Sequence, residues 1–399
     1  MKITPTSVRN HFTRYIKNIL PTIVLAQFAC TSLWFAGNAV LPSLIPQFML
    51  EASSLSHLTS AVQLGFILGT LLFAVLAIAD RYSPSKVFLV CAVAGAGCNL
   101  SLLLAEGLST LLLSRFLTGF CLAGIYPVGM KIAADYHQKG LGKALGYLVG
   151  ALVLGTAFPH LLRGLTQDLP WRYVILGTSA LAVVGGVALY LLVPDGPYRS
   201  KGARPNFSTF FQIFKEKKFR AAAFGYFGHM WELYTLWAYI PVMLALYQVN
   251  NSKGQELSFP LWAFAIIAVG AVACVAGGYV SQKVGSARTA FVGLAISMVC
   301  CLLSPWLFTL SLPLFLGYLL VWGFTVVMDS PQFSALVAQA APSQTKGTAL
   351  TIVNCIGFAI TIVSIQFLQG VQVYVKAEYQ FMFLAIGPLL GLLSMRRLL

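Results

Sequence analysis

The stretch from Leu261 to Tyr279 reads LWAFAIIAVGAVACVAGGY and contains no charged side chain. Phe291–Phe308 and Val174–Val193 are similar uncharged runs. A run of about 18 or more apolar residues is long enough to cross the hydrocarbon core of a bilayer as a helix. Across the whole chain, 58% of the residues are hydrophobic and only 9% are charged, which is far from the balance of a soluble domain. The sequence therefore predicts an integral membrane protein.

Short polar breaks, such as Asp80–Lys86, divide the apolar sequence into twelve runs. The predicted spans cover residues 19–46, 57–80, 86–106, 109–131, 140–163, 171–193, 221–248, 258–281, 288–309, 312–339, 347–370 and 377–394. We expect an all-α, multi-pass protein. An even number of spans places both termini on the same face of the membrane.

Most of the 26 Lys and Arg residues fall on that same face. They are Lys2, Arg9, Arg14, Lys17, Arg81, Lys86, Lys131, Lys139, Lys143, Arg199, Lys201, Arg204, Lys215, Lys217, Lys218, Arg220, Lys283, Arg288, Lys346, Arg396 and Arg397. Basic residues flanking membrane spans stay cytoplasmic. We therefore expect both termini to be cytoplasmic, in a plasma membrane of the bacterial inner-membrane type. The net charge of +15 is interpreted as a topology signal with some attraction to anionic lipid, and a nucleic-acid partner is not expected.

The sequence contains signs of an internal duplication. Gly119-Phe120 with Pro127 is repeated as Gly323-Phe324 with Pro331, 204 residues later. Weaker matches pair Arg81 and Lys86 with Lys283 and Arg288, and Ala144-Leu145 with Ala349-Leu350. We therefore divide the chain into a six-helix bundle at residues 1–194, a linker at 195–220 and a second bundle at 221–399. Duplicated bundles of this kind build transporters whose substrate site lies between the halves.

Aromatic residues recur at helical spacing inside the predicted linker, at Phe207, Phe210, Phe211 and Phe214. Beside them stand several lysines. This pattern is typical of a short helix lying on the membrane surface. A plain flexible linker is the alternative.

The loop after the second span reads Ala79-Asp80-Arg81-Tyr82-Ser83-Pro84-Ser85-Lys86. It resembles the signature loop of the major facilitator superfamily, and the loop from Gly278 to Arg288 resembles its second copy. The copies are imperfect: Leu76 and Ser83 stand where the first copy has glycines, and Gln282 replaces the acid of the second. The resemblance implies two six-helix bundles. It also implies a conformational gate at Asp80, with Arg81, Lys86, Lys283 and Arg288, although a solvated topogenic turn is the alternative.

Two other stretches resemble motifs of the same superfamily. Arg115-Phe116-Leu117-Thr118-Gly119 looks like its arginine motif in the fourth helix. Gly146–Gly155 is similar to the glycine-rich motif of drug/proton antiporters, but Ala151 replaces the diagnostic proline. Close helix packing alone explains these glycines.

Three ionisable residues, Arg115, Glu232 and Asp329, fall deep within predicted spans. Each opposes insertion by roughly 2.5–3.5 kcal/mol at a helix centre, so each must face the bundle interior, a partner or water. Arg115 is a candidate anchor for an acidic group of a solute, because guanidinium binds carboxylates bidentately. A buried structural ion pair is the alternative.

Polar stripes mark the first, fourth, seventh and tenth spans, which line the cavity in the superfamily that this chain resembles. The stripes are Gln27, Thr31, Trp34 and Asn38; Arg115, Thr118 and Tyr126; Gly225, His229, Glu232 and Tyr239; and Thr325, Asp329 and Gln332. From them we select as substrate-binding candidates Arg115, Tyr126, Trp34, Asn38, Gln27 and Gln332, together with Trp237. For the aromatic members, packing is an equal alternative.

Proton coupling is assigned to Glu232, His229 and Asp329. Histidine titrates near neutrality, and His229 lies one helical turn from Glu232. A hydrogen-bonded packing role is the alternative for the histidine.

We therefore expect a secondary active transporter that moves a small anionic or zwitterionic organic solute by alternating access, coupled to protons. Efflux of lipophilic compounds by proton antiport is the closest alternative, and a non-transporting receptor or scaffold on the same fold is another. No nucleotide-binding loop of the Walker type is found in the sequence, so ATP-driven transport would need a separate subunit. No catalytic cluster is found in the sequence either, so an enzyme is not expected. The eight cysteines lack metal-type spacing, and we expect neither metal nor cofactor in a monomeric protein.

Overall fold

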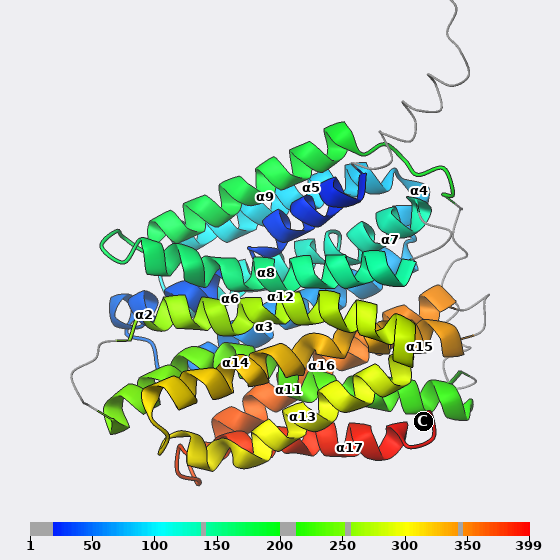
Figure 1. Cartoon of the computed structure of the whole chain (residues 1–399). Helices are drawn as coiled ribbons and strands as arrows, with labels where there is room; N and C mark the ends of the chain where they lie inside the picture. Colours follow the sequence, from blue (N-terminus) through cyan, green and yellow to red (C-terminus); the bar gives the residue numbers. More distant parts are fainter. Residues whose placement is uncertain (1–18, 137–140, 200–212, 252–256, 342–345) are drawn as a thin grey trace, which may run out of the picture.

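A computed structural model describes residues 19–136, 141–199, 213–251, 257–341 and 346–399. Within these ranges the ordered elements are all helical, and no strand is formed (Figure 1). Of the predicted surface helix, Phe207, Phe210 and Phe211 lie outside the described residues. Phe214 is described and packs edge-on against Phe219, with ring centroids 5.2 Å apart.

Twelve helical spans follow one another in the described chain. The first spans Ile19–Phe48, with turns at 32–35 and α2 (Ala36–Phe48) after them. The other spans of the first half are α3 (Ser54–Val75); α5 (Pro84–Leu100) with η1 (Ser101–Leu104); α6 (Leu108–Leu122) with α7 (Tyr126–Tyr136); α8 (Leu141–Leu165); and α9 (Arg172–Leu192). Those of the second half are α11 (Lys217–Asn250), α12 (Phe259–Val284), α13 (Ser286–Leu307), α14 (Leu312–Met328) with α15 (Ser330–Ala340), α16 (Lys346–Val371), and η3 (Gln380–Ala385) with α17 (Ile386–Met395).

Ten of these spans are long and apolar enough to cross a membrane. The two others are α11, which has 34 residues but begins with several charges, and the shorter apolar helix Gln380–Met395. The twelve predicted spans correspond in order to these helices, and the all-helical fold class predicted from the sequence is confirmed.

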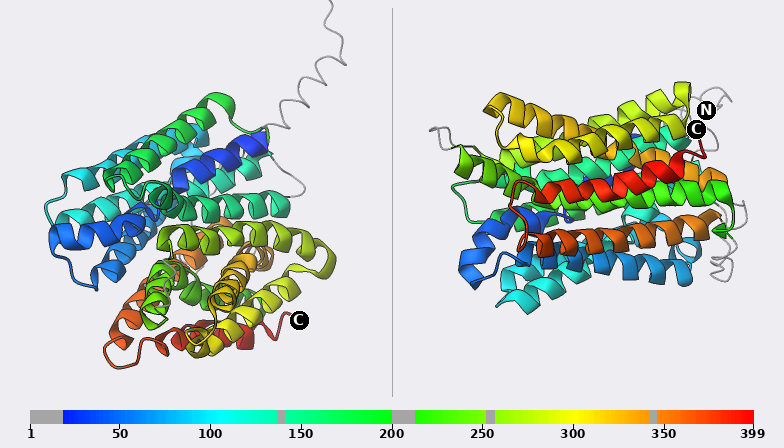
Figure 2. Two further views of the ribbon diagram at one scale, coloured as in Figure 1. Left: turned by 60° about the vertical axis from the view of Figure 1, so that its left-hand side comes forward. Right: turned by 90° about the horizontal axis from the view of Figure 1, so that it is seen from below.

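The helices form two bundles that lie side by side. The left view of Figure 2 separates the first half, coloured blue to green, from the second half, coloured yellow-green to red. The bundles meet along two seams, α8 against α12 and α3 against α16. The start of the first span, α4 (Ile78–Arg81), the end of α15 and the end of α17 lie at one end of the molecule (Figure 1), which we call the terminal face. The other end is called the opposite face.

Two equivalent close contacts support the internal duplication. Gly119 on α6 packs so tightly on α3 that an added Cβ would lie 2.0 Å from the carbonyl oxygen of Val62. Gly323 on α14 packs on α12 in the same way, and its Cβ would lie 2.0 Å from the carbonyl oxygen of Ile266. Both pairs are 204 residues apart. The same helix crossing is therefore built twice, and in both copies only glycine fits.

Three of the spans are interrupted near their middle. Residues 32–35 break the first span, residues 123–125 separate α6 from α7, and Asp329 separates α14 from α15. The last two breaks precede Pro127 and Pro331, the prolines matched in the repeat. Proline supplies no N–H to the preceding turn, and broken helices in a membrane occur where protein or water satisfies the freed backbone groups.

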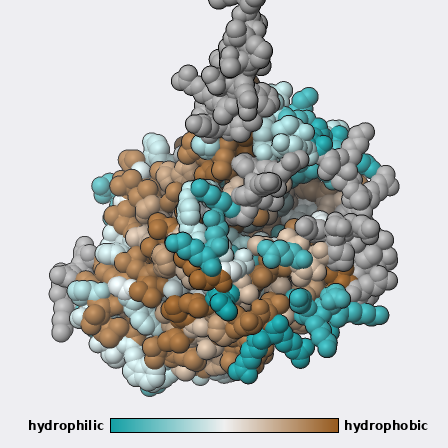
Figure 3. Space-filling model, turned by 45° about the vertical axis from the view of Figure 1, so that its right-hand side comes forward, coloured by the Kyte–Doolittle hydropathy of each residue, from teal (hydrophilic) through white to brown (hydrophobic). Residues whose placement is uncertain are grey.

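The flanks of the bundle are apolar. Large exposed side chains such as Leu68, Val90, Val184 and Val321 lie on different helices, each at least 45% exposed. Figure 3 shows hydrophilic residues gathered toward the terminal face and hydrophobic residues over the flank. Apolar side chains exposed around a helical bundle are what lipid contact requires.

Candidate functional site between the two halves

Arg115 is completely buried on α6 and points at the break in the first span. Its Nη2 donates to the carbonyl oxygens of Trp34 and of Leu33, the latter at 3.1 Å. Its Nη1 donates to Oδ1 of Asn99 at 3.3 Å. An added Cβ at Gly37 would lie 2.9 Å from the Arg115 side chain, so this glycine makes room for it. Arg115 therefore satisfies backbone carbonyls that the turn at 32–35 leaves without regular helical partners.

Glu232 lies on α11 inside the second half and is 1% exposed. Its Oε1 accepts hydrogen bonds from Nε1 of Trp322 at 2.6 Å, from Sγ of Cys301 at 3.2 Å, and from Oγ of Ser297. The second oxygen, Oε2, has no hydrogen-bond partner among the described residues. Its donors come from α13 and α14, so this carboxyl group is held within the second half.

His229 and Asp329 form a second buried polar pair in the same half. Nδ1 of His229 lies 2.8 Å from Oδ1 of Asp329, and both side chains are 1% exposed. Asp329 stands at the break, directly before the amino end of α15, where the helix dipole favours a negative charge. The three deep ionisable groups of the sequence thus all have partners within their own half, as the energetics of the bilayer require.

A small cavity lies between the halves. Its aromatic lining consists of Tyr126, Tyr226, Tyr234, Trp237 and Phe358. The rest of the lining is Val149, Leu152, Val153, Met230, Leu233, Val327 and Ser330. The cavity volume is about 20 Å³, room for about one water molecule. No acidic or basic side chain is among these lining residues.

Six rings fill the space beside the cavity, and we call them the central aromatic cluster: Trp34, Phe35, Phe66, Tyr234, Trp237 and Phe358. Trp34 stacks on Tyr234 and on Phe358, each with ring centroids 5.7 Å apart. Phe66 lies 4.5 Å from Phe358, and Tyr234 lies 5.2 Å from Trp237. Since three of these rings come from the first half and three from the second, the cluster joins the halves.

The structure brings together only some of the predicted substrate-binding residues. Tyr126 and Trp237 line the cavity, and Trp34 contacts two of its lining rings. The three amides lie elsewhere. Gln27 is buried, with its Oε1 against Gly129 of α7; Asn38 donates to Oγ1 of Thr59 at 2.7 Å; and Gln332 is 3% exposed on α15, beside Gly277 of α12. Their role in binding, like that of Arg115, stays a prediction.

Apart from Trp237, sequence reasoning missed the side of α11 that lines the cavity. Tyr226, Met230, Leu233, Tyr234 and Trp237 line it together. Their spacing of four, three, one and three residues is that of one helix face, so an aromatic stripe was present in the sequence. The polar stripe through His229 and Glu232 occupies the neighbouring face and points into the second half.

The loop acid Asp80 is held by the first half. Its Oδ1 lies 2.9 Å from Nζ of Lys131 on α7. Arg199 donates to the backbone carbonyls of Asp80 and Tyr82 at 3.2 and 2.7 Å, and pairs with Asp195. Lys131 and Arg199 were counted in the sequence only as topology signals. The other predicted gate residues, Arg81, Lys86, Lys283 and Arg288, are exposed at the terminal face.

The two halves are also joined toward the opposite face, and each seam contributes one hydrogen bond there. Nε2 of Gln167, just after α8, donates to Oγ of Ser258 at 2.7 Å. Nε2 of Gln366 on α16 donates to Oγ of Ser60 on α3 at 2.9 Å. Both seams are thus closed on this side of the cavity.

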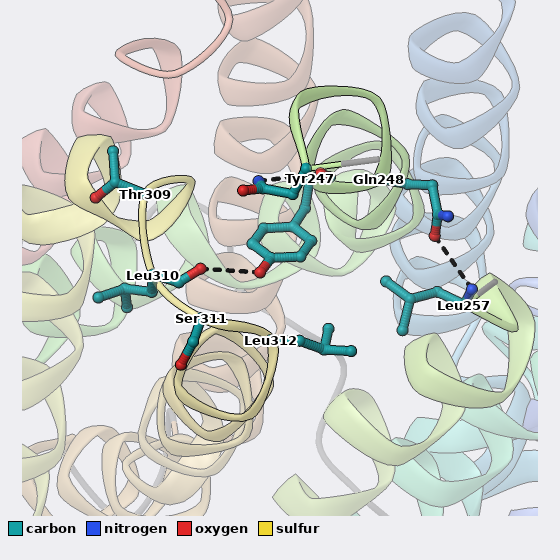
Figure 4. A pocket seen from close by; sticks show the side chains of 8 residues that line it. Tyr247, Gln248, Leu257, Thr309, Leu310, Ser311 and Leu312 are labelled. Atoms are coloured by element: carbon teal, nitrogen blue, oxygen red, sulfur yellow. Dashed lines mark hydrogen bonds between the residues drawn. The ribbon is translucent and has the colours of Figure 1, made fainter. Parts of the chain in front are cut away.

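A larger cavity of about 500 Å³ lies at the opposite face. It is lined by the end of α11, Leu257 and the turn before α14, and Figure 4 shows Tyr247 donating to the carbonyl oxygen of Leu310 across it, at 2.8 Å. All its lining residues belong to the second half. The small central cavity is therefore the better candidate for a site that both halves share.

The sequence profile of the Major Facilitator Superfamily matches residues 23–365. YgaY of Escherichia coli (strain K12), which is named an uncharacterized transporter, is 25% identical over 244 residues, which are 59% of this chain and 61% of YgaY. The transporter AraJ of the same strain is 23% identical over 192 residues, which are 47% of this chain and 48% of AraJ. The chain thus spans about half of each of these curated relatives, or a little more.

Among solved structures, the crystal structure of the human organic anion transporter MFSD10 (TETRAN) matches with a TM-score of 0.74. The match covers 95% of this chain and 99% of that chain, at 16% sequence identity. At this identity, the likeness shows a shared fold.

Proposed function

The chain belongs to the major facilitator superfamily, and from this premise we propose that it is a secondary transporter of a small organic solute that works by alternating access. The observation that carries the proposal is the central cavity, whose lining comes from both halves. A site shared by two repeats opens to either side when the repeats rock against each other.

The lining of the cavity favours a solute with a flat, largely apolar body. Five of the lining side chains are aromatic and none is charged. Arg115 does not line the cavity, since its Nη atoms bind backbone carbonyls and Asn99. This favours the lipophilic alternative over a small, highly charged ion. Because the human structural neighbour is named an organic anion transporter, aromatic carboxylates remain among the solutes to test.

Protons are proposed as the coupling ion, through Asp329, His229 and Glu232. Asp329 precedes Ser330, which lines the cavity, and His229 lies beside Tyr226, with ring centroids 6.1 Å apart. A proton taken up by this pair would change its ion pairing directly behind the cavity wall.

Cross-linking the opposite face tests alternating access. In a variant without native cysteines, Gln167→Cys and Ser258→Cys would be joined by a short bis-thiosulfonate reagent. We expect uptake of labelled aromatic compounds and metabolites into proteoliposomes to fall to the protein-free level, because the cross-linked seam can no longer open. Uptake should recover after the cross-link is reduced. Single-cysteine variants treated in the same way are the control. Undiminished uptake after complete cross-linking would contradict alternating access, and absence of uptake for every compound would favour the receptor reading.

We expect both termini to lie on the cytoplasmic side. Lys86→Cys at the terminal face and Glu106→Cys in the loop between the third and fourth spans are exposed positions on opposite sides. In intact cells, an impermeant maleimide should label Glu106→Cys and leave Lys86→Cys unlabelled until the cells are broken. The reverse pattern would invert the topology.

Arg115→Lys separates two roles of this arginine. A lysine keeps the charge but loses the planar fork that serves two carbonyls and Asn99 at once. We expect the melting temperature of the solute-free protein to fall, by an amount equivalent to roughly 1–3 kcal/mol, as measured by thermal shift in detergent. An unchanged melting temperature with weakened solute binding would instead support Arg115 as the solute anchor.

A further inference from the structure

Two buried tryptophans have indole N–H groups without a hydrogen-bond partner among the residues that the structure describes. Of the four tryptophans that are buried among the described residues, Trp171 donates to Oε1 of Gln47 at 2.9 Å and Trp322 donates to Glu232 at 2.6 Å. Trp34 and Trp237 are completely buried, and neither Nε1 atom has a hydrogen-bond partner within the described chain. A buried donor left unpaired is unfavourable and calls for an explanation, such as a ligand or an ordered water.

The two unpaired indoles occupy similar places in the two halves. Each follows a leucine, as Leu33-Trp34 and Leu236-Trp237, 203 residues apart. This offset is one residue shorter than the 204 of the repeated glycines. Trp34 comes from the broken first span and Trp237 from the equivalent first span of the second half, so the duplication presents one donor from each side.

One of the two indoles lines the shared cavity, and the other packs against a lining ring. Trp237 lines it. Trp34 stacks on Tyr234, which also lines it, with interplanar angle 30°. Tyr234 therefore lies between the two indoles, 5.7 Å from Trp34 and 5.2 Å from Trp237.

A third ring nitrogen without a partner lies near them. Nε2 of His160 on α8 is buried and has no hydrogen-bond partner among the described residues. Its ring lies 6.5 Å from Phe35, and Phe35 lies 6.4 Å from Trp237. The ring nitrogens of Trp34, His160 and Trp237 thus all adjoin the central aromatic cluster.

We propose that the indole N–H groups of Trp34 and Trp237 determine specificity by donating to an oxygen acceptor, a carbonyl or carboxylate, on a flat aromatic solute. Indole can only donate a hydrogen bond, so the matching group must be an acceptor. A site built around such donors rejects an analogue that lacks the acceptor much more strongly than it rejects a change in apolar size. The inference rests on the proposed function, because it assigns the chemistry of the solute bound at that cavity.

The first test measures the solute-free protein. Trp34→Phe and Trp237→Phe remove a donor that has no partner, whereas Trp171→Phe removes one that is bonded. All three lose a similar volume. We expect a smaller fall in melting temperature for the first two variants than for Trp171→Phe. Equal or larger falls for both would overturn the inference, because the indoles would then be satisfied in the free protein. If one of the two variants fails to fold, the comparison of the other with Trp171→Phe tests the inference.

The second test uses three compounds with one ring system: 2-naphthoate, 2-naphthamide and 2-methylnaphthalene. In thermal shift with the purified full chain, at least one oxygen-bearing compound should raise the melting temperature more than methylnaphthalene. A shift with naphthoate alone identifies a carboxylate, and shifts with both identify a carbonyl oxygen. In Trp34→Phe and Trp237→Phe this difference should disappear. It should persist in Trp231→Phe, whose indole is bonded to the carbonyl oxygen of Phe383 at 3.2 Å.

Equal shifts for the three compounds, no shift with either oxygen-bearing compound, or shifts unchanged in both cluster variants would overturn the inference. An ordered water on the indoles would give the last result. Failure of the transport proposal is distinguishable, because it concerns flux. Uptake by wild-type proteoliposomes with unchanged selectivity in the variants would contradict only the indole assignment. Indole-dependent binding without uptake would contradict only transport.

Discussion

Replacing Gly119 or Gly323 with alanine is expected to destabilise the protein strongly, and by similar amounts. In each case the new Cβ would lie 2.0 Å from a backbone carbonyl oxygen of the facing helix, at Val62 or at Ile266. Backbone cannot rotate away as a side chain can, so α6 must separate from α3, or α14 from α12. Overpacking of this kind costs roughly 1–3 kcal/mol or more. Thermal shift and fluorescence-detected size exclusion would measure the loss of folded protein.

Matched controls exist within the same bundles. A Cβ added at Gly97 on α5 or at Gly317 on α14 meets nothing within 4 Å. Alanine there should be neutral or slightly stabilising, because it is a better helix former than glycine. If Gly119→Ala and Gly323→Ala were tolerated as well as these controls, the close helix crossing would be refuted. If only one of them were harmful, the two copies of the repeat would not be equivalent at this crossing.

Most of the fold could be predicted from the sequence, because the bilayer imposes a simple rule on the chain. A helix must satisfy its own backbone and cover it with apolar side chains, and this alone delimits runs such as Leu261–Tyr279 to within a few residues. The repeat could also be recognised in the sequence, because the close helix contacts at Gly119 and Gly323 permit no residue other than glycine. The breaks at 32–35 and at Asp329 were harder to predict from the sequence, because a break in a helix depends on distant partners such as Arg115.

The candidate site was only partly predictable, for a physical reason. Polar residues inside predicted spans are the first candidates for a binding site. However, Arg115, Glu232 and Asp329 also need partners inside the membrane, and the structure gives each of them partners within its own half. The face of α11 that meets the other half carries tyrosine, methionine and tryptophan instead. Such residues resemble ordinary packing in a sequence. Which face of a helix meets the partner bundle is decided by tertiary packing, and hydrophobic pattern alone does not encode it.

Asp329→Asn is expected to abolish uphill, pH-driven transport and to spare solute exchange. Asparagine keeps the size of the side chain and a polar group beside His229, whose Nδ1 lies 2.8 Å from Oδ1 of Asp329, but it cannot titrate. With one proton per solute, a gradient of one pH unit supplies about 1.4 kcal/mol and should give about tenfold accumulation in wild-type liposomes. The variant should reach only the level of equilibration. Gradient-driven uptake and counterflow in the same preparation would show both properties.

Glu232→Gln tests whether the second carboxyl group shares this task. Its Oε1 is held by Trp322, Cys301 and Ser297, and glutamine can keep an acceptor at that position. If protons pass through Glu232, this variant also loses accumulation and keeps counterflow. Glu106→Gln, at an exposed position, should behave as wild type in both assays. Loss of counterflow together with accumulation would indicate damage to folding or binding. Full accumulation by both Asp329→Asn and Glu232→Gln would refute coupling through these residues, and their charges would then serve only to hold α11, α13, α14 and α15 together.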